Sequence, residues 1–248
     1  MSGGARIRRS WRHIELQFAA DVTQTRISRW FPQRLHIGYT RSMLAALWLH
    51  PQPQRIGIIG LGGGAQARFC HRHLPLARID VAENDAGVLA LRDAFGVPPD
   101  SERFRVEHAD GAQWLRRQRG CFDLLLLDAY DANGIPPALS TQGFYDDCRA
   151  ALTADGVMAS NLYDTDFHGH LQRLRRSFDG RLLPLDEPGM DNTVVIAWNG
   201  MPQPGPVAAA LKQLPWSARG QLRAGFKRLA QAWPQGGLQN SKSSAAHR

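Results

Sequence analysis

The fold is indicated most clearly by "IGIIGLGGGAQARF", Ile56 to Phe69. An apolar run is typical of a buried strand, and this one leads directly into glycines and then into a helical segment. Glycine permits unusual φ angles and lets a ligand approach the main chain near a helix N-terminus. Gly60, Gly62, Gly64 and Ala65 also satisfy the dinucleotide pattern G-x-G-x-x-A. Because the same turn suits tight packing of a strand on a helix, the motif alone leaves the identity of any ligand open.

Strand-like apolar runs alternate with helical segments from residue 55 onward. We expect strands near 55–60, 78–83, 103–107, 122–127 and 156–161, and helices near 64–74, 84–95, 111–118, 140–153 and 166–177. This alternation predicts an α/β protein with a doubly wound, largely parallel sheet. The run "FDLLLL" at 122–127 fits a central strand that is buried on both faces.

Two further strand-like runs, "GRLLPL" and "NTVVIAW", close this region and are separated only by "DEPGMD". So short a connection cannot contain a crossover helix, and the pair is therefore expected to be antiparallel. A parallel sheet that ends in an antiparallel pair is the layout of class I AdoMet-dependent transferases, which have a Rossmann-like sheet. We predict that fold class by analogy.

The remaining segments define the predicted organisation of the chain. Alternating apolar residues in 12–18, followed by "VTQTRIS", indicate a small β-hairpin. We expect an N-terminal hairpin region over 1–37 and a Rossmann-like nucleoside-binding catalytic domain over 38–200. A basic helical segment is expected over 201–233. The polar, small-residue tail 234–248 is expected to be disordered.

Composition bounds the class of protein. Of the 248 residues, 43% are hydrophobic and 21% are charged, which is ordinary for a globular protein. The longest apolar runs are too short for a membrane span, and the start of the chain lacks the apolar core of a secretory signal. Three scattered cysteines are most simply reduced thiols. We therefore expect a cytoplasmic protein that does not contact the membrane.

The net charge of +8 comes mainly from arginines and lysines near the two ends of the chain. Such an excess is one signature of a nucleic-acid surface. The basic residues are not interleaved with aromatic residues and match no nucleic-acid-binding motif. Solvated surface arginines are therefore the favoured interpretation, and nucleic acid is an unfavoured partner.

Acidic residues follow two of the predicted strands. Glu83 ends the second strand about twenty residues after the glycines, where an acid accepts hydrogen bonds from both hydroxyls of a ribose. Its alternative role is that of a surface acid that caps the next helix. Asp110 and Gly111 follow the third strand, where Asp110 would bind an adenine amino group or cap a helix. The sequence does not decide between these two roles.

The sharpest feature is the pair Asp128 and Asp131 in "LLLLDAYDANGIP". Both follow an apolar central strand at its carboxyl end, where open α/β sheets bind ligands. A carboxylate pair at this edge would hold a cationic amine and accept its proton, although "DANG" is also typical of a turn. The nine histidines show no metal-ligand spacing, and no G-x-S-x-G elbow is present.

Five blocks taken together resemble the polyamine aminopropyltransferases, that is, spermidine synthase and its relatives. In order, they are "IIGLGGGA", "VAENDAGV", "HADGAQWL", "FDLLLLDAYDANGIPPALSTQGFYDDC" and "LTADGVMASNL". The fourth block is the most specific, because D-x-x-D, a proline-containing loop and then Phe-Tyr are not general to Rossmann folds. The resemblance implies transfer of an aminopropyl group from decarboxylated S-adenosylmethionine to a small-molecule amine, without a metal.

The resemblance also implies roles for individual residues. Asp128 would be the general base, and Asp131 with Tyr130 would bind the amine. The nucleoside would be bound by residues of the hairpin, the glycine loop and the two following strand ends, namely Gln24, Gly60, Gly62, Gly64, Glu83, Asp110 and Gly111. Synthases of this family often dimerise, which leaves a homodimer open.

Two departures from the family pattern keep other functions open. The family's glycine loop usually has an Asp for the aminopropyl ammonium, whereas this loop has Gly63 and Ala65. The family's acidic amine-binding segment is replaced by "YTRSML", in which Arg41 would repel a diamine. One alternative is a methyltransferase that uses S-adenosylmethionine itself. Another is a non-catalytic binding protein on a degenerate synthase scaffold.

Overall fold

The computed structural model describes residues 6–9, 11, 13–17, 23–28, 30, 33–131, 134–163 and 165–234. Its main sheet has seven strands in the order β6-β5-β4-β7-β8-β10-β9. The strands are β4 (Arg55–Ile59), β5 (Arg78–Glu83), β6 (Phe104–His108), β7 (Phe122–Leu127), β8 (Leu152–Leu162), β9 (Leu182–Asp186) and β10 (Thr193–Trp198). Strand β10 is antiparallel to both of its neighbours, and the other pairs are parallel. The predicted class I transferase fold is confirmed.

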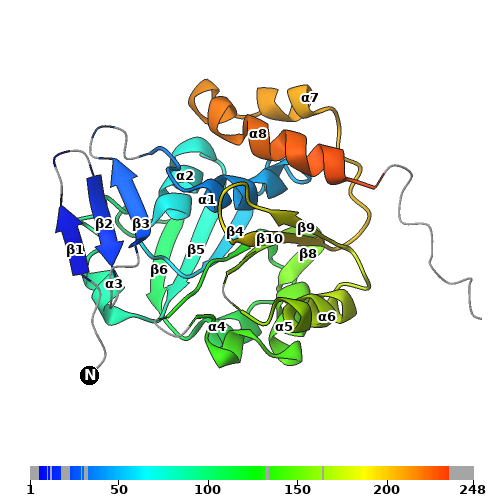
Figure 1. Cartoon of the computed structure of the whole chain (residues 1–248), viewed down its shortest axis with the longest axis horizontal. Coiled ribbons are helices and arrows are strands. Elements are labelled where there is room, and N and C mark those ends of the chain that lie inside the picture. The colour runs from blue at the N-terminus through cyan, green and yellow to red at the C-terminus, as the bar shows by residue number, and fades with distance from the viewer. Residues whose placement is uncertain are drawn as a thin grey trace, which may run out of the picture.

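Helices cover both faces of this sheet (Figure 1). One face is covered by α4 (Gly111–Arg116), α5 (Gln142–Ala151) and α6 (Phe167–Ser177). The other face is covered by α1 (Gly38–Met43), the 3-10 helix η1 (Leu44–Trp48), α2 (Ala65–His73), α7 (Val207–Lys212) and α8 (Trp216–Ala232). The short helices α3 (Ala86–Ala90) and η2 (Pro137–Leu139) lie in connections.

The sheet divides the core into two layers, because alternate side chains of a central strand such as β7 point into opposite layers. Side chains of a strand point alternately to opposite faces. Leu124 and Leu126 therefore pack with η1 and α8, while Leu125 and Leu127 pack with α4, α5 and α6. All four are buried, so β7 is the central strand that its uninterrupted apolar sequence predicts.

The N-terminal strands form a separate antiparallel sheet in the order β1-β2-β3. Pairing of β2 (His13–Gln17) with β3 (Thr23–Ser28) confirms the hairpin. Strand β1 (Arg6–Arg9) pairs with β2 and was not predicted, because "RIRR" has no apolar alternation. Only the main chain of these three strands is described.

Two predicted elements differ in length from those of the structure. The helix expected over 84–95 ends at Ala90, and hydrogen-bonded turns continue the chain to Gly96, whose φ is +63°. Strand β8 begins at Leu152, ahead of the predicted 156. Its first residues include the exposed Ala154 and Asp155, which carry no apolar strand signal. Neither difference moves a carboxyl strand end.

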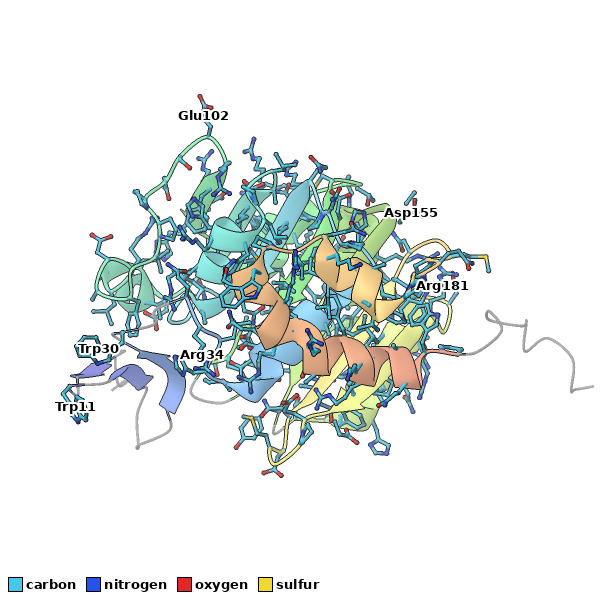
Figure 2. The ribbon with its side chains drawn as sticks, turned by 90° about the horizontal axis from the view of Figure 1, so that it is seen from above. Trp11, Trp30, Arg34, Glu102, Asp155 and Arg181 are labelled. Carbon is cyan, nitrogen blue, oxygen red and sulfur yellow. The ribbon has the colours of Figure 1, made fainter. Side chains whose placement is uncertain are left out.

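The C-terminal helix α8 packs across α1 and η1, as seen from above in Figure 2. Three tryptophans fix this layer: Trp233 lies edge-on to Trp48 at 5.8 Å and packs on Trp198 at 4.6 Å between ring centroids. Within the described part of the chain, no helix is both long and apolar enough to cross a membrane. The domain boundaries stay predictions, and all but the first residue of the predicted tail 234–248 lies outside the described residues.

Candidate active site

The glycine loop joins β4 to α2 at the carboxyl edge of the sheet. Gly60 has a φ of +90° and lies so close to β7 that a Cβ there would overlap the carbonyl oxygen of Asp128. Gly64, with a φ of +68°, is the N-cap of α2 and leaves no room for a side chain beside Val97. These two glycines therefore have a packing role whether or not a ligand binds. Gly62, with a φ of +49°, is partly exposed.

Glu83, at the end of β5, fixes the main chain of the glycine loop through hydrogen bonds. One carboxylate oxygen accepts hydrogen bonds from the main-chain N–H groups of Leu61 at 2.7 Å and Gly62 at 3.4 Å. The other oxygen accepts from the N–H of Asp85 at 2.8 Å. Glu83 is only 9% exposed, and Asp85 rather than Glu83 caps α3. The alternative of a surface acid capping the next helix is therefore wrong.

Asp110 is the N-cap of α4 and accepts a hydrogen bond from the N–H of Gln113 at 2.9 Å. The following residue, Gly111, is buried, and a Cβ there would lie 2.5 Å from a methyl group of Ile59. The capping role is thus observed. The cap uses only one carboxylate oxygen, so the second could still accept a hydrogen bond from an adenine. Binding of an adenine by Asp110 stays a prediction.

Asp128 follows β7 directly and accepts hydrogen bonds from three neighbouring elements. Oδ2 accepts from the side-chain amide of Gln66 in α2 at 2.9 Å, and Oδ1 accepts from that of Asn161 in β8 at 3.1 Å. The hydroxyl of Tyr39 in α1 also hydrogen-bonds to the carboxylate. All three donors are uncharged.

This environment changes the acidity of Asp128. Burial raises its pKa to about 6, and the hydrogen bonds from Asn161, Tyr39 and Gln66 offset only part of that rise. Desolvation disfavours the charged carboxylate, whereas hydrogen bonds to the anion favour it. A pKa near the working pH is typical of a group that gains and loses a proton in catalysis.

Helix α1 determines which side chains face Asp128. Tyr39 and Met43 are four residues apart and share one helix face, and the sulfur of Met43 accepts from the same Gln66 amide at 3.3 Å. Arg41 lies between them in sequence and projects elsewhere, donating to the carbonyl of Leu35 at 2.6 Å. The repulsion expected between Arg41 and a diamine therefore does not act from the face that meets Asp128.

The other predicted amine-binding residues lie in the loop after β7. The hydroxyl of Tyr130 donates to the carbonyl of Asn161 at 2.7 Å and accepts from the N–H of Tyr163 at 2.8 Å. Asp131 is exposed, and its main chain pairs with Gly134. Gln24 lies in β3, where only the main chain is described. The predicted role of the Gln24 side chain therefore lies outside the described part of the chain.

Three residues around Asp128 were not singled out from the sequence. Asn161 carries a recognisable signal, because it lies near the carboxyl end of the strand beside β7. Tyr39 and Gln66 carry weaker signals, since each lies in the first turn of a helix whose orientation depends on tertiary packing. The site is therefore richer in uncharged hydrogen-bond donors than its acidic motif indicates.

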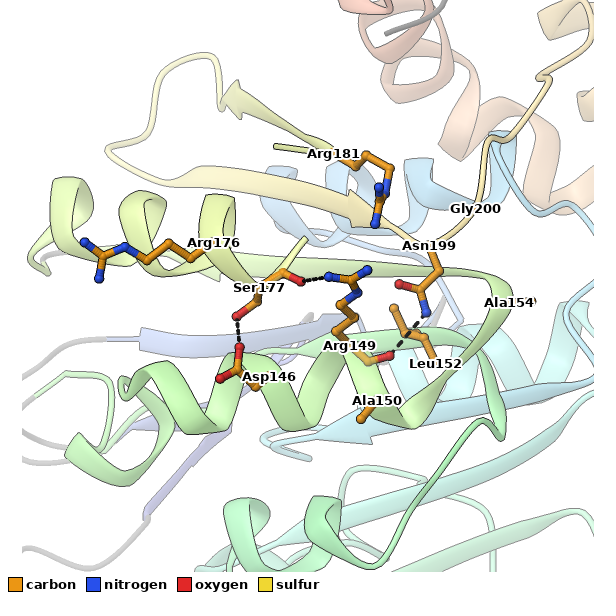
Figure 3. Close-up of a pocket in the computed structure, with 10 residues that line it drawn as sticks. All are labelled: Asp146, Arg149, Ala150, Leu152, Ala154, Arg176, Ser177, Arg181, Asn199 and Gly200. Atoms are coloured by element: carbon orange, nitrogen blue, oxygen red, sulfur yellow. Dashed lines mark hydrogen bonds between the residues drawn. The ribbon is translucent and has the colours of Figure 1, made fainter. Parts of the chain in front are cut away.

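A large open cavity of about 590 Å³ lies at the opposite edge of the sheet, where β8 begins (Figure 3). Two of its arginines, Arg149 and Arg181, bind the same carboxylate of Asp179 at 2.8 and 3.0 Å. The guanidinium of Arg176 extends away from the other two (Figure 3). This cavity is distant from Asp128 along the strands and is lined by none of the predicted site residues, so size alone does not identify the active site.

Comparison with known proteins places the chain in a family. The model of the spermine/spermidine synthase domain matches residues 39–173, more than half of the chain. A polyamine aminopropyltransferase of Neisseria meningitidis serogroup A is 33% identical over 192 residues, which cover 76% of this chain and 73% of the relative.

Solved structures agree at the level of the fold. A probable spermidine synthase from Corynebacterium glutamicum superposes with a TM-score of 0.70 at 18% identity, covering 84% of this chain and 82% of that chain. Human methyltransferase-like protein 13, in complex with SAH, gives 0.63 at 23% identity, covering 84% and 97%. The family model and the aminopropyltransferase of 33% identity together settle the classification: the chain belongs to the spermine/spermidine synthase family.

Proposed function

We propose that this protein transfers an aminopropyl group from decarboxylated S-adenosylmethionine to a small-molecule amine, with Asp128 as the general base. One observation carries the proposal. At the ligand-binding edge of the sheet, the Asp128 carboxylate is held by three uncharged donors, and burial raises its pKa to about 6. A carboxylate in that state attracts a cation and readily accepts a proton.

The hydrogen-bond capacity of Asp128 supports this role. An ionised carboxylate offers about four acceptor positions. The amides of Gln66 and Asn161 and the hydroxyl of Tyr39 occupy three. One position remains, which suits a single N–H of a substrate ammonium. The three fixed donors hold the carboxylate in one orientation, so the remaining acceptor position would bind the substrate N–H in one defined direction.

The reaction balances with these groups alone. The amine nitrogen is mostly protonated at neutral pH and gives one proton to Asp128. Its lone pair forms a bond to the aminopropyl carbon beside the sulfonium. The bond from that carbon to sulfur breaks, and its electron pair stays on sulfur, which leaves methylthioadenosine. Since the sulfonium is already a good leaving group, much of the rate would come from positioning the two substrates.

The nucleoside would lie along the glycine loop, with Glu83 on the ribose and Asp110 with Gly111 on the adenine. One carboxylate oxygen of Glu83 already accepts from the N–H groups of Leu61 and Gly62, and the other accepts only from Asp85 and retains one acceptor position for a ribose hydroxyl. Asp131 and Tyr130 would bind the distal part of the amine. Gln24 would contact the nucleoside from the N-terminal sheet.

Calorimetry tests which nucleoside the site accepts. Decarboxylated S-adenosylmethionine and S-adenosylmethionine would be titrated separately, with methylthioadenosine as the common reference. We expect the decarboxylated form to bind at least tenfold more tightly, followed by aminopropyl transfer to one member of a diamine panel. A preference for S-adenosylmethionine would contradict the proposal.

A second function is favoured by the glycine loop itself. The residue after its last glycine is Ala65, so the loop offers no acid to the ammonium of an aminopropyl group. S-adenosylmethionine carries a carboxylate beside its amine and would tolerate a neutral loop better. A methyltransferase would then use Asp128 to orient or deprotonate its acceptor. Absence of binding by all three nucleosides would instead favour a binding protein that lacks catalysis.

A further inference from the structure

Two buried asparagines lie behind Asp128, one on β8, which adjoins β7, and one just before β10, the next strand of the sheet. Asn161 is near the end of β8, and Asn192 immediately precedes β10, in the tight connection from β9. They are 4% and 6% exposed. The antiparallel register of β8 and β10 places Val194 opposite Asn161, which brings the Asn192 side chain to the same place from a segment remote in sequence.

The two amides form a directional chain that ends on the carboxylate. The Asn192 side-chain nitrogen donates to Oδ1 of Asn161 at 2.9 Å. The Asn161 side-chain nitrogen donates in turn to Oδ1 of Asp128 at 3.1 Å. The main chain of Asn161 is also fixed, because its carbonyl accepts from the hydroxyl of Tyr130 at 2.7 Å.

Hydrogen-bonding capacity sets the direction of this chain. An ionised carboxylate only accepts, so Asn161 must turn its NH₂ group toward Asp128 and its oxygen toward Asn192. Asn192 must then present its own NH₂ group. If the Asn161 amide flipped, its NH₂ group would face that of Asn192 and its oxygen would face the carboxylate. Both new contacts would be repulsive in a buried site.

We propose that Asn192 is a positioning residue: it locks the Asn161 amide as a donor to Asp128 and so favours the ionised form of the base. Chains of hydrogen bonds also polarise one another, so donation from Asn192 strengthens the bond that Asn161 makes. Asn192 contacts neither the carboxylate nor the reacting atoms. The inference rests on the proposed role of Asp128 as a base.

The titratable and charged groups near the Asn192–Asn161–Asp128 hydrogen bonds do not themselves fix the orientation of the Asn161 amide. Tyr39 from α1 and Tyr130 from the loop after β7 face Asp128, and burial raises the pKa of both phenols, so both stay neutral at physiological pH. Beside Asn192, Glu187 pairs with Arg228 of α8 at 2.8 Å. The N–H of Glu187 bonds the carbonyl of Asn192 and holds the connection closed.

The test measures the acidity of Asp128 directly, in the full-length protein without substrate. A ¹³C NMR titration of labelled aspartate carboxyl groups, in which Asp128→Asn identifies the signal, would compare wild type with Asn192→Leu. Leucine is close to asparagine in shape but cannot donate. We expect the pKa of Asp128 to rise by about 0.5 to 1 unit, because the released Asn161 amide no longer stabilises the anion fully.

Asn192→Ser guards against misfolding of the leucine variant, since serine is polar and too short to reach Asn161. It should give a rise in the same direction. Asn199→Leu is the matched control: the side-chain amide of Asn199 is also a donor, to the carbonyls of Arg149 and Thr153, but at the opposite edge of the sheet (Figure 3). That variant should lose stability without moving the Asp128 titration.

Kinetics provide a second readout. The acidic limb of the kcat/KM profile should move to higher pH with the NMR value, while kcat well above the limb and KM for the nucleoside stay near wild type. An unchanged Asp128 titration in both Asn192 variants would overturn the inference. A shifted titration in a protein that transfers no aminopropyl group would support the role of Asn192 and reject the proposed function instead.

Discussion

Two aspartates at opposite edges of the same sheet show how differently one side chain can be used. Asp128 is partly buried among uncharged donors, and burial raises its pKa to about 6. Asp179 is exposed and lies between Arg149 and Arg181, whose hydrogen bonds hold its pKa below the usual value. A carboxylate matched by cations is fixed in its ionised form. A carboxylate left without them retains a proton affinity that a reaction can use.

The largest expected effect is loss of turnover in Asp128→Asn. Asparagine keeps the shape of the side chain but cannot accept the proton of the amine. Turnover should fall by about 10² to 10⁴-fold, the usual contribution of a general base. Nucleoside affinity should stay within a few-fold of wild type. Steady-state kinetics and calorimetry on the same preparation measure both, and unchanged turnover would show that another group is the base.

The pH dependence of the wild-type reaction tests whether the ionisation of Asp128 controls the rate. Only ionised Asp128 accepts a proton, so kcat/KM should fall about tenfold per pH unit below a midpoint near 6. The measurement is a kcat/KM profile in buffers of constant ionic strength. A profile that stays flat to about pH 5 would mean that Asp128 does not limit the rate through its ionisation.

Stability should change in the direction opposite to activity. Because the folded pKa of Asp128 is raised from 3.8 to about 6, the folded state binds this proton more tightly than the unfolded state does. The ionised carboxylate therefore destabilises the fold as pH rises from the unfolded toward the folded pKa, and the cost is complete above the latter. Asp128→Asn should raise the free energy of unfolding by about 1–2 kcal/mol near neutral pH, allowing for one mismatched amide donor.

Urea denaturation at two pH values checks the sign of this effect. The gain in Asp128→Asn should fall by about 1 kcal/mol at about pH 5 and so largely disappear, because wild-type Asp128 is then mostly protonated when folded. A variant less stable than wild type at neutral pH would mean that the three donors stabilise the anion more than burial destabilises it.

The smallest effect is expected for Asp179→Asn. Asp179 has a φ of +52°, a conformation that asparagine also tolerates, so the substitution tests its two ion pairs with little backbone strain. Exposed pairs are weak, and the free energy of unfolding should fall by less than about 1 kcal/mol. Turnover should not change. A loss of turnover comparable to that of Asp128→Asn would contradict the assignment of the active site to the carboxyl edge.

The sequence predicts well what depends on local periodicity and strand ends. Uninterrupted apolar residues identify β7 as central, the short "DEPGMD" link identifies the antiparallel pair, and the end of β7 locates Asp128. These features follow from rules that act over a few residues or one crossover.

The donors around Asp128 could not be predicted in the same way. Asn192 reaches the site only because β10 runs antiparallel to β8 in one particular register, and a shift by one residue would point it to the other face. The position of the Tyr39 hydroxyl near Asp128 depends on how α1 packs against the rest of the fold. Such residues report tertiary packing, which leaves no short-range pattern in the sequence.

The packing of α8 on α1 has a consequence for the order in which the protein folds. Gln221 of α8 accepts a hydrogen bond from the N–H of Leu35 across a separation of 186 residues, and a Cβ on Gly225 would lie only 3.2 Å from the carbonyl oxygen of Arg41. Helix α1, which presents Tyr39 to Asp128, is synthesised early but gains this packing partner only after α8 has emerged. The region around Asp128 should therefore be among the last parts to become rigid, and contacts of such long range slow the search for the native state.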